Sequence, residues 1–279
     1  VLAASFTAVP ASGLAPVLLI TALFGALGLA DDLATVNTRL KFLLFAGLCL
    51  ALVPAAGPVT RLPFTLDIGL DLPVWLGVLG SALFVFVVVN AVNFMDGSDG
   101  MLAAVMIPAS AGLCLAGMVS GTGAASLIGV ALAGALAGFA VLNRPPAKVF
   151  AGDVGSLTAG AAYAGGALAM AGQGFSGSLW LAPLFVLVFL ADVLLTLLRR
   201  LRHGRLSLQA HREHAYQRLI QSGWSHGRLA LIYGALTLGI VLTGLAAAQG
   251  PDGLVPAVFA LWVVILIGLY AAAGRIARV

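Results

Sequence analysis

At residues 74–100 the chain reads VWLGVLGSALFVFVVVNAVNFMDGSDG. Its first part, residues 74–89, is uncharged and apolar, and a helix needs about 20 such residues to cross a bilayer. The polar residues that follow, Asn90, Asn93, Asp96 and Asp99, recur at every third position, which places side chains on one face of a helix end or tight loop. Charge at membrane depth is costly and is functional by default. The segment therefore predicts a polar site where a membrane helix ends.

The composition of the whole chain agrees with a membrane protein. The 279 residues are 61% hydrophobic and 9% charged, with a mean hydropathy of +1.11, whereas soluble domains carry about 25% charged residues. We expect an all-α, polytopic transmembrane helix bundle that forms one domain over residues 1–279. About nine spans fit the hydropathy, at residues 13–30, 40–56, 75–93, 100–119, 122–142, 156–172, 179–198, 229–248 and 254–273. Because residue 1 is Val and not Met, we interpret the N-terminus as truncated.

The positive charges predict the orientation of these spans. If the loop at residues 31–39 is cytoplasmic, every Lys and Arg except Arg61 falls on the cytoplasmic side, as the positive-inside bias requires. The sequence pI of about 9.5 then reflects topology, and no nucleic-acid partner is expected. The outer segment 63–72 alternates weakly between apolar and polar residues, and we predict a short hairpin there.

Two acidic motifs predict a site for a metal or a charged ligand. Asp31 and Asp32 end the first span; adjacent carboxylates raise each other's proton affinity, so one can act as a base or help to hold a divalent cation. The alternative is a helix end turned to water, although acids at a helix C-terminus oppose the helix dipole. Asp96 and Asp99 have no Lys or Arg nearby in sequence, which also favours a metal or a ligand's donors. Asn90 and Asn93 could instead form hydrogen bonds between helices. Lys41 fits either the charge bias of the loop or a phosphate-binding role.

A second motif, NRPPAKVFAGDVGS at residues 143–156, joins two spans. Pro145 and Pro146 stop the first helix, and we expect the next helix to begin at Ser156, where free backbone amides suit a phosphate. Lys148 adds positive charge. Asp153 is a candidate Mg²⁺ ligand, because Mg²⁺ is commonly held by one or two carboxylates together with substrate phosphates.

The basic loop at residues 199–228 contains all four histidines. Its segment HREHAYQR, residues 211–218, predicts a helix with His211, His214 and Arg218 on one face. We favour a cationic face for a diphosphate over a zinc site, because no third His or Cys completes a zinc set. His203 and His226 are interpreted as solvated. Asp192, inside the preceding span, either pairs across the bundle or supports the site.

Taken together, these motifs resemble those of the polyprenyl-phosphate N-acetylhexosamine-1-phosphate transferases, glycosyltransferase family 4. Asp31-Asp32 is similar to the family's paired-Asp motif, and residues 90–100 match its NAxNxxDGxDG motif at every fixed position. Residues 146–156 resemble its PAKVFMGDxGS segment, with Ala151 in place of Met. Asp192, Arg199, Arg200 and Gly204 fall where the sugar-nucleotide branch carries Asp, Arg-Arg and Gly. The first one or two helices of the family are missing, so the resemblance implies about ten or eleven spans in the full protein.

The loop at residues 211–219 departs from the family pattern DRxHxHHRL. Arg212, His214, Arg218 and Leu219 match, whereas His211, Tyr216 and Gln217 do not. This form resembles the branch that starts O-antigen or related surface polysaccharides, often with a modified N-acetylated amino sugar. It argues against the peptidoglycan enzyme, whose loop has consecutive histidines.

The resemblance implies transfer of an N-acetylhexosamine-1-phosphate, or a modified amino sugar-1-phosphate, from a UDP-sugar to undecaprenyl phosphate with release of UMP. It implies a metal site of Asp153 and Asp96 for Mg²⁺, with Mn²⁺ as an alternative ion. The catalytic residues would be Asp31, Asp32 and Lys41, with Asp31 preferred as the base. The substrate-binding residues would be Asn90, Asn93, Asp96, Asp99, Lys148, Arg212 and His214.

Expected partners are the UDP-activated amino sugar, undecaprenyl phosphate, membrane lipid and a second copy in a homodimer. The expected location is the bacterial inner membrane, with a cytoplasmic active site. The rival interpretation is a secondary transporter, which predicts acids near span midpoints in matching halves of an internal repeat.

Overall fold

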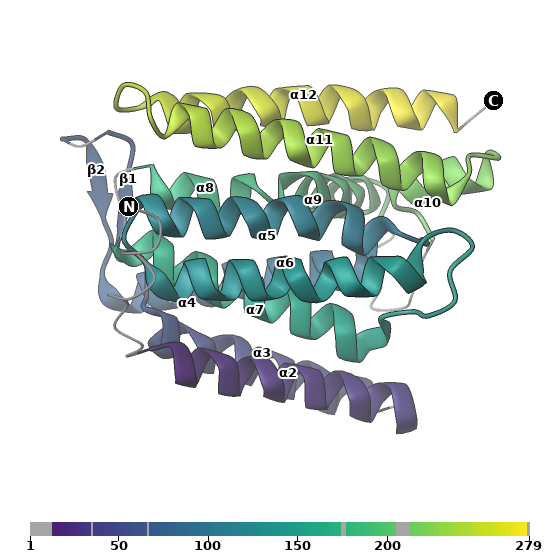
Figure 1. The fold of residues 1–279 in the computed structure, drawn as a ribbon, viewed down its shortest axis with the longest axis horizontal. Helices are drawn as coiled ribbons and strands as arrows, with labels where there is room; N and C mark the ends of the chain where they lie inside the picture. The colour runs from purple at the N-terminus through teal and green to yellow at the C-terminus, as the bar shows by residue number, and fades with distance from the viewer. Residues whose placement is uncertain (1–12, 35, 66, 174–176, 205–211, 278–279) are drawn as a thin grey trace.

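The computed structural model describes residues 13–34, 36–65, 67–173, 177–204 and 212–277, and Figure 1 shows long helices running along one common direction. The helices are α2 (Leu14–Ala34), α3 (Thr38–Ala56), α4 (Val74–Met95), α5 (Met101–Val119), α6 (Gly123–Asn143), α7 (Gly152–Gln173), α8 (Ser178–Leu184), α9 (Leu187–Arg202), α10 (Ala215–Gln221), α11 (His226–Ala247) and α12 (Leu254–Ile276). The strands are β1 (Arg61–Pro63) and β2 (Gly69–Asp71). The predicted all-α bundle is confirmed.

Helix α7 lies at the centre of the bundle and packs against α2, α3, α4, α5 and α6. Small residues let the neighbouring helices approach it closely. A Cβ at Gly28 of α2 would lie 2.4 Å from the carbonyl oxygen of Asp153, and one at Gly160 of α7 would lie 2.8 Å from the Cα of Val89. Close backbone contact through small residues is a common way for helices to associate in lipid. Here it fixes the first turn of α7 against the end of α2.

The outer surface of the bundle is apolar. Only 11% of the membrane-length window of α12 is buried, against 72% for α7, and large side chains such as Leu261 and Val264 are exposed along it. Backbone polar groups in hydrocarbon must be satisfied within the segment, and α-helices achieve this. An apolar exterior on such helices places the protein in a membrane, which it crosses several times.

Within the described residues, 8 helices are long and apolar enough to span a membrane, and the α8–α9 pair makes a ninth segment that is bent by 67°. The number of spans therefore agrees with the expectation, but the continuous span predicted at residues 179–198 is wrong. Pro183 lies inside α8, and α9 begins only at Leu187. Proline removes an amide donor and disfavours a continuous helix, so Pro183 weakens this segment shortly before the break.

The predicted hairpin forms at the end of the bundle opposite the acidic motifs (Figure 1). Strands β1 and β2 pair in antiparallel register, with Arg61 opposite Asp71. The indole Nε1 of Trp180 in α8 donates a hydrogen bond of 2.5 Å to the carbonyl oxygen of Pro63. The hairpin is thereby attached to the broken helix pair.

Candidate active site

The acidic motifs meet at the end of the bundle where α2 and α4 end and α3 and α7 begin. Lys41 of α3 lies between two of the acids. Its Nζ is 2.5 Å from Oδ2 of Asp31 and 2.6 Å from Oδ2 of Asp153, and the three side chains are 20 to 29% exposed. The cation therefore joins two carboxylates that are far apart in sequence, at a position that solvent still reaches. Ligands can enter such a cluster.

Asp32 makes different contacts from its neighbour Asp31. Its Oδ1 accepts a hydrogen bond of 3.1 Å from the backbone amide of Asp153, and its Oδ2 accepts one of 3.0 Å from the amide of Val154. Helix α7 begins at Gly152, so the prediction that it begins at Ser156 is wrong. Free amides at a helix start attract an anion, and in this protein Asp32 supplies it. Asp153 consequently projects from the first turn of α7 and not from a loop.

Asn93 orients Asp153 from the end of α4. Its Nδ2 donates hydrogen bonds of 2.9 Å to Oδ1 of Asp153 and of 2.9 Å to Oγ of Ser156. The Ser156 hydroxyl in turn donates to the carbonyl oxygen of Gly152 at 2.8 Å. With Lys41 on Oδ2 and Asn93 on Oδ1, the Asp153 carboxylate is held in one orientation. Ser156 was not among the predicted site residues, although it belongs to the motif that contains Asp153.

Asp96 caps the end of α4, close enough to Asp153 for the negative charge there to act on its carboxyl group. Burial, and then the negative charge of Asp153, raise its pKa from 3.8 to about 7. No hydrogen bond to its carboxylate joins it to any of the residues that the structure describes. A carboxyl group that resists ionisation beside a second carboxylate would be stabilised by a shared cation.

This pair fits Mg²⁺ by its donor chemistry. No group of three or more His, Cys, Asp and Glu side chains suited to a metal occurs within the described ranges. These residues therefore do not form a site in which protein side chains supply all the metal ligands. Mg²⁺ instead prefers oxygen ligands and is often held by one or two carboxylates, with water and substrate phosphates completing its octahedron. Asp153 and Asp96 would supply that smaller set.

Asp99 joins two loops of the site. Its Oδ2 accepts a hydrogen bond of 3.0 Å from the amide of Ala147, while its own amide donates to Nδ1 of His226 at 3.2 Å. The amide of the next residue, Gly100, donates to Oδ1 of Asn143 at 2.8 Å. Gly100 has a φ of +75°, a backbone conformation that favours glycine. These contacts hold the loop at residues 96–100 against the loop at residues 144–151.

His226, interpreted from the sequence as solvated, takes part in this junction. It begins α11, and its Nδ1 also lies 3.0 Å from Oγ of Ser98. Its side chain is 40% exposed. One signal for this role is that His226 directly follows Ser225, a residue type that favours helix starts; in the structure Ser225 caps α11 by accepting a hydrogen bond from the amide of Arg228. Residues at such a helix start are held in place, unlike those in a solvated loop.

His214 is buried and does not lie within a helix. It immediately precedes α10, its side chain is 4% exposed, and its Nδ1 is 3.4 Å from Oδ1 of Asp192. The predicted face shared by His214 and Arg218 is therefore wrong for the described residues, because α10 starts only at Ala215. The contact with Asp192 instead holds His214 inside the bundle. His211 lies outside the described residues.

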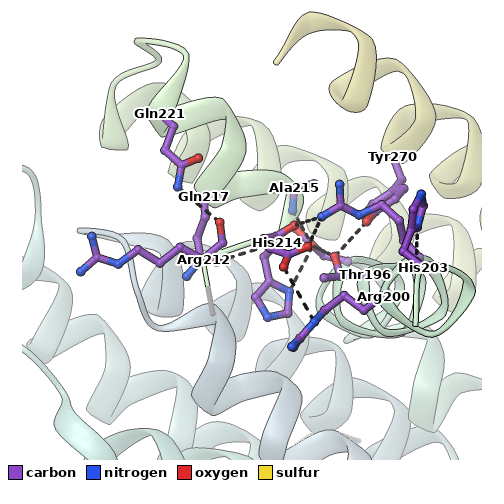
Figure 2. A network of polar contacts seen from close by, with 12 residues as sticks. Thr196, Arg200, His203, Arg212, His214, Ala215, Gln217, Gln221 and Tyr270 are labelled. Atoms are coloured by element: carbon purple, nitrogen blue, oxygen red, sulfur yellow. Dashed lines mark hydrogen bonds and ion pairs between the residues drawn. The ribbon is translucent and has the colours of Figure 1, made fainter. Parts of the chain in front are cut away.

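Within the described part of the chain, the other predicted substrate-binding residues make no hydrogen bond or ion pair with the carboxylate cluster. Asn90 donates to the carbonyl oxygen of Phe86 in its own helix at 2.8 Å, and Lys148 is exposed. Arg212 is exposed as well, and Figure 2 shows its side chain extending away from His214. Their roles in substrate binding stay predictions.

Fold and site together define a multi-pass membrane protein with a carboxylate–lysine cluster at one end of its bundle. The sequence profile of glycosyl transferase family 4 matches residues 14–171, more than half of the chain. The chain is 31% identical over 246 residues to the phospho-N-acetylmuramoyl-pentapeptide-transferase of Carboxydothermus hydrogenoformans, covering 81% of this chain and 74% of that protein. It is 37% identical over 218 residues to the enzyme of the same name from a Synechococcus species, covering 73% and 56%.

A further relative is the decaprenyl-phosphate N-acetylglucosaminephosphotransferase of Mycobacterium tuberculosis, 34% identical over 181 residues, or 58% of this chain and 45% of that protein. The chain thus spans roughly half to three quarters of the length of these relatives. It belongs to glycosyl transferase family 4, and the resemblance to the sugar-phosphate transferases of that family is confirmed.

Proposed function

We propose that the protein transfers an N-acetylhexosamine-1-phosphate, or a modified amino sugar-1-phosphate, from a UDP-sugar to undecaprenyl phosphate. An oxygen of the lipid phosphate attacks the phosphorus that carries the sugar, and the bond from that phosphorus to the bridging oxygen of the diphosphate breaks, so that the bridging oxygen leaves with UMP. UMP leaves and a lipid diphosphate sugar forms. The observation that supports this most directly is Lys41, which holds Asp31 and Asp153 together at an accessible helix end.

The residues of the cluster have different roles in this proposal. Asp153 and Asp96 would hold Mg²⁺, which when bound neutralises the charge of the diphosphate; phosphoryl transfer depends mainly on such neutralisation and on positioning. Asp31 is placed to accept the proton of the lipid phosphate, because its partner Lys41 can exchange the carboxylate for a phosphate oxygen. Asp32, whose oxygens both bind amides of α7, would act by placing Asp153.

The acceptor and the location follow from the same features. The cluster lies at the end of apolar helices, so a lipid phosphate can approach along the bilayer while a nucleotide sugar arrives from water. We place the site on the cytoplasmic side of a bacterial inner membrane, because the basic residues gather at this end of the spans. Among the described acids, only Asp192 lies in a helix interior, whereas a transporter would need acids near several span midpoints.

The sugar is proposed from the loop that departs from the family pattern. Tyr216 and Gln217 replace the consecutive histidines of the peptidoglycan branch, so we propose an acetylated amino sugar that starts O-antigen or a related surface glycan. Purified protein with undecaprenyl phosphate should be assayed against a panel of UDP-sugars, UDP-N-acetylmuramoyl-pentapeptide among them. Preference for that pentapeptide would overturn the assignment to a surface-glycan branch.

The metal assignment is tested by Asp153→Asn, with Asp71→Asn in the hairpin as a matched control at the opposite end of the bundle. We expect Asp153→Asn to abolish Mg²⁺-dependent UMP release while thermal unfolding in detergent stays close to that of the parent protein. Asp71 is 80% exposed on its side chain, and its replacement should leave the rate unchanged. Normal turnover by Asp153→Asn would reject the proposed metal site.

A further inference from the structure

Asp192 is a buried carboxylate with an unusual number of donors around it. Its Oδ1 accepts hydrogen bonds from the amide of Ala215 at 2.8 Å and from Oγ1 of Thr196 at 3.3 Å. Its Oδ2 accepts from the amide of Tyr216 at 3.2 Å and from the hydroxyl of Tyr233 at 2.8 Å. Asp192 itself is 4% exposed. Figure 2 labels two of these donor residues, Ala215 of α10 and Thr196 of α9.

Burying a carboxylate is costly, and its hydrogen bonds often do no more than offset that cost. Apolar packing between α9 and α10 would stabilise the fold as well as this carboxylate does. What the carboxylate adds is geometry, because its two oxygens accept the two successive amides of Ala215 and Tyr216. They fix the position and the direction of the first turn of α10.

Helix α10 is in turn connected to the end of α4 by a hydrogen bond. The hydroxyl of Tyr216, a fully buried residue, donates a hydrogen bond of 3.0 Å to the carbonyl oxygen of Phe94. The ring of Phe94 in turn lies 5.9 Å from the ring of His214, measured between centroids. The carbonyl groups in the last turn of a helix have no partner within the helix, so an outside donor fixes that end.

Gly97 supplies a separate observation for the same contact. A Cβ at this position would lie 2.2 Å from the hydroxyl oxygen of Tyr216. Tyr216 thus occupies the space beside the backbone that immediately follows Asp96. Its pKa is raised by burial, and the negative charges of Asp192 and Asp96 both contribute, so the hydroxyl keeps its proton and remains a donor.

We propose that Asp192 is a positioning residue for the transfer reaction: it fixes α10 so that Tyr216 holds the end of α4 and thereby keeps Asp96 beside Asp153. This inference rests on the proposed function. It assigns no substrate contact to Asp192 itself. Its effect reaches the site through Tyr216 and the backbone of residues 94–97.

Two tyrosines provide a matched pair of variants. Tyr216→Phe removes the bond to Phe94 but leaves the bonds of Asp192 to α10, whereas Tyr233→Phe removes one donor to Asp192 and leaves the contact with α4. Both replace a buried tyrosine by the same residue. We expect Tyr216→Phe to raise the half-saturating Mg²⁺ concentration and the KM for the UDP-sugar by about five- to tenfold, the equivalent of one net hydrogen bond, and Tyr233→Phe to change them by less than about twofold.

Asp192→Asn turns one of the two acceptor oxygens into an NH2 donor, which then faces the backbone amide of either Ala215 or Tyr216. Amide hydrogen exchange should then quicken in the peptides that cover residues 94–99 and 212–221, while α5 and α6 keep their protection. A purely structural role would lower the active fraction, and so kcat, with KM and the Mg²⁺ requirement unchanged. That result, or unchanged exchange at residues 94–99, would overturn the proposal.

If Asp192→Asn does not fold, the tyrosine pair decides: equal effects of Tyr216→Phe and Tyr233→Phe would also overturn it. Failure of the proposed function has a different signature, namely no UMP release by the parent protein with any UDP-sugar. Exchange at residues 94–99 in the Tyr216→Phe and Asp192→Asn proteins would even then show whether α10 controls the end of α4.

Discussion

Asp32 caps the helix that carries Asp153, with both of its carboxylate oxygens bound to amides in the first turn of α7. Asp31, the preceding residue, instead accepts hydrogen bonds from the amide of Val36 and from Lys41. Two carboxylates that look equivalent in the sequence therefore have different surroundings. One positions the proposed metal ligand, and the other remains close to the proposed reacting groups.

This difference predicts different defects for the two amide variants. Asp31→Asn should lower kcat by about a hundredfold or more, as expected for the loss of a general base. Asp32→Asn keeps one acceptor oxygen and should be milder, whereas Asp32→Ala loses the cap and should cost about 1 kcal/mol of unfolding free energy. Initial rates and thermal unfolding, measured on all three proteins, check this. Equal kinetic defects in Asp31→Asn and Asp32→Asn would contradict the division of roles.

Lys41 predicts a defect that depends on charge and on shape. Lys41→Met leaves Asp31 and Asp153 facing each other without the cation, so turnover should fall by about a hundredfold or more, the usual effect of removing a preorganised charge from an active site. Lys41→Arg keeps the charge but carries it on a planar group and should recover only part of the activity. Rates at saturating UDP-sugar measure this. Full activity of Lys41→Met would show that the bridge is structural only.

The pKa of Asp96 predicts a pH-dependent metal requirement. The raised value, about 7, means that the folded protein keeps this proton over a range in which an ordinary carboxyl has lost it. Protons and Mg²⁺ then compete for the group, because metal ligands must be deprotonated. The half-saturating Mg²⁺ concentration should rise as the pH falls below about 7, approaching tenfold per pH unit, and Asp96→Asn should remove this dependence. Mg²⁺ titrations between pH 6 and 8 measure this dependence. A half-saturating Mg²⁺ concentration that stays roughly constant across this range would contradict the prediction.

The same shift has a consequence for stability. Between the ordinary carboxyl pKa of 3.8 and about 7, the folded state binds more protons at Asp96 than the unfolded state does. The stabilisation from this proton is complete below 3.8 and is lost as the pH rises through about 7. In EDTA, the parent protein should therefore lose stability relative to Asp96→Asn as the pH is raised across that window. Parallel unfolding curves for the two proteins would contradict the assignment.

Much of the fold could be predicted from sequence because hydropathy and charge act locally. Apolar runs give the spans, and the acidic motifs at the ends of several spans predict a site at one end of the bundle. The roles of individual acids could not be predicted in this way, since Asp32 as a helix cap and Asp153 as a proposed metal ligand are the same residue type in similar motifs. The start of α7 was missed because its cap comes from residue 32, which only the tertiary structure brings near. For the same reason the sequence does not show the contact of His226 with Ser98 or that of Asp192 with Tyr233, because each joins segments that are distant in the chain.

Gly28 provides a test of how tightly the site depends on packing. A Cβ at this position would lie 2.4 Å from the carbonyl oxygen of Asp153, which is backbone and cannot turn aside. Gly28→Ala should push α2 away from the first turn of α7, costing about 1 to 3 kcal/mol by overpacking, and should lower kcat because Lys41 can no longer join Asp31 and Asp153. Gly47→Ala in α3 is the matched control, because a Cβ there would meet nothing within 4 Å. It should leave activity unchanged and slightly favour the helix. Unfolding and initial rates of the two alanine variants give the comparison, and similar behaviour of both would show that the close approach of α2 to α7 does not control the site.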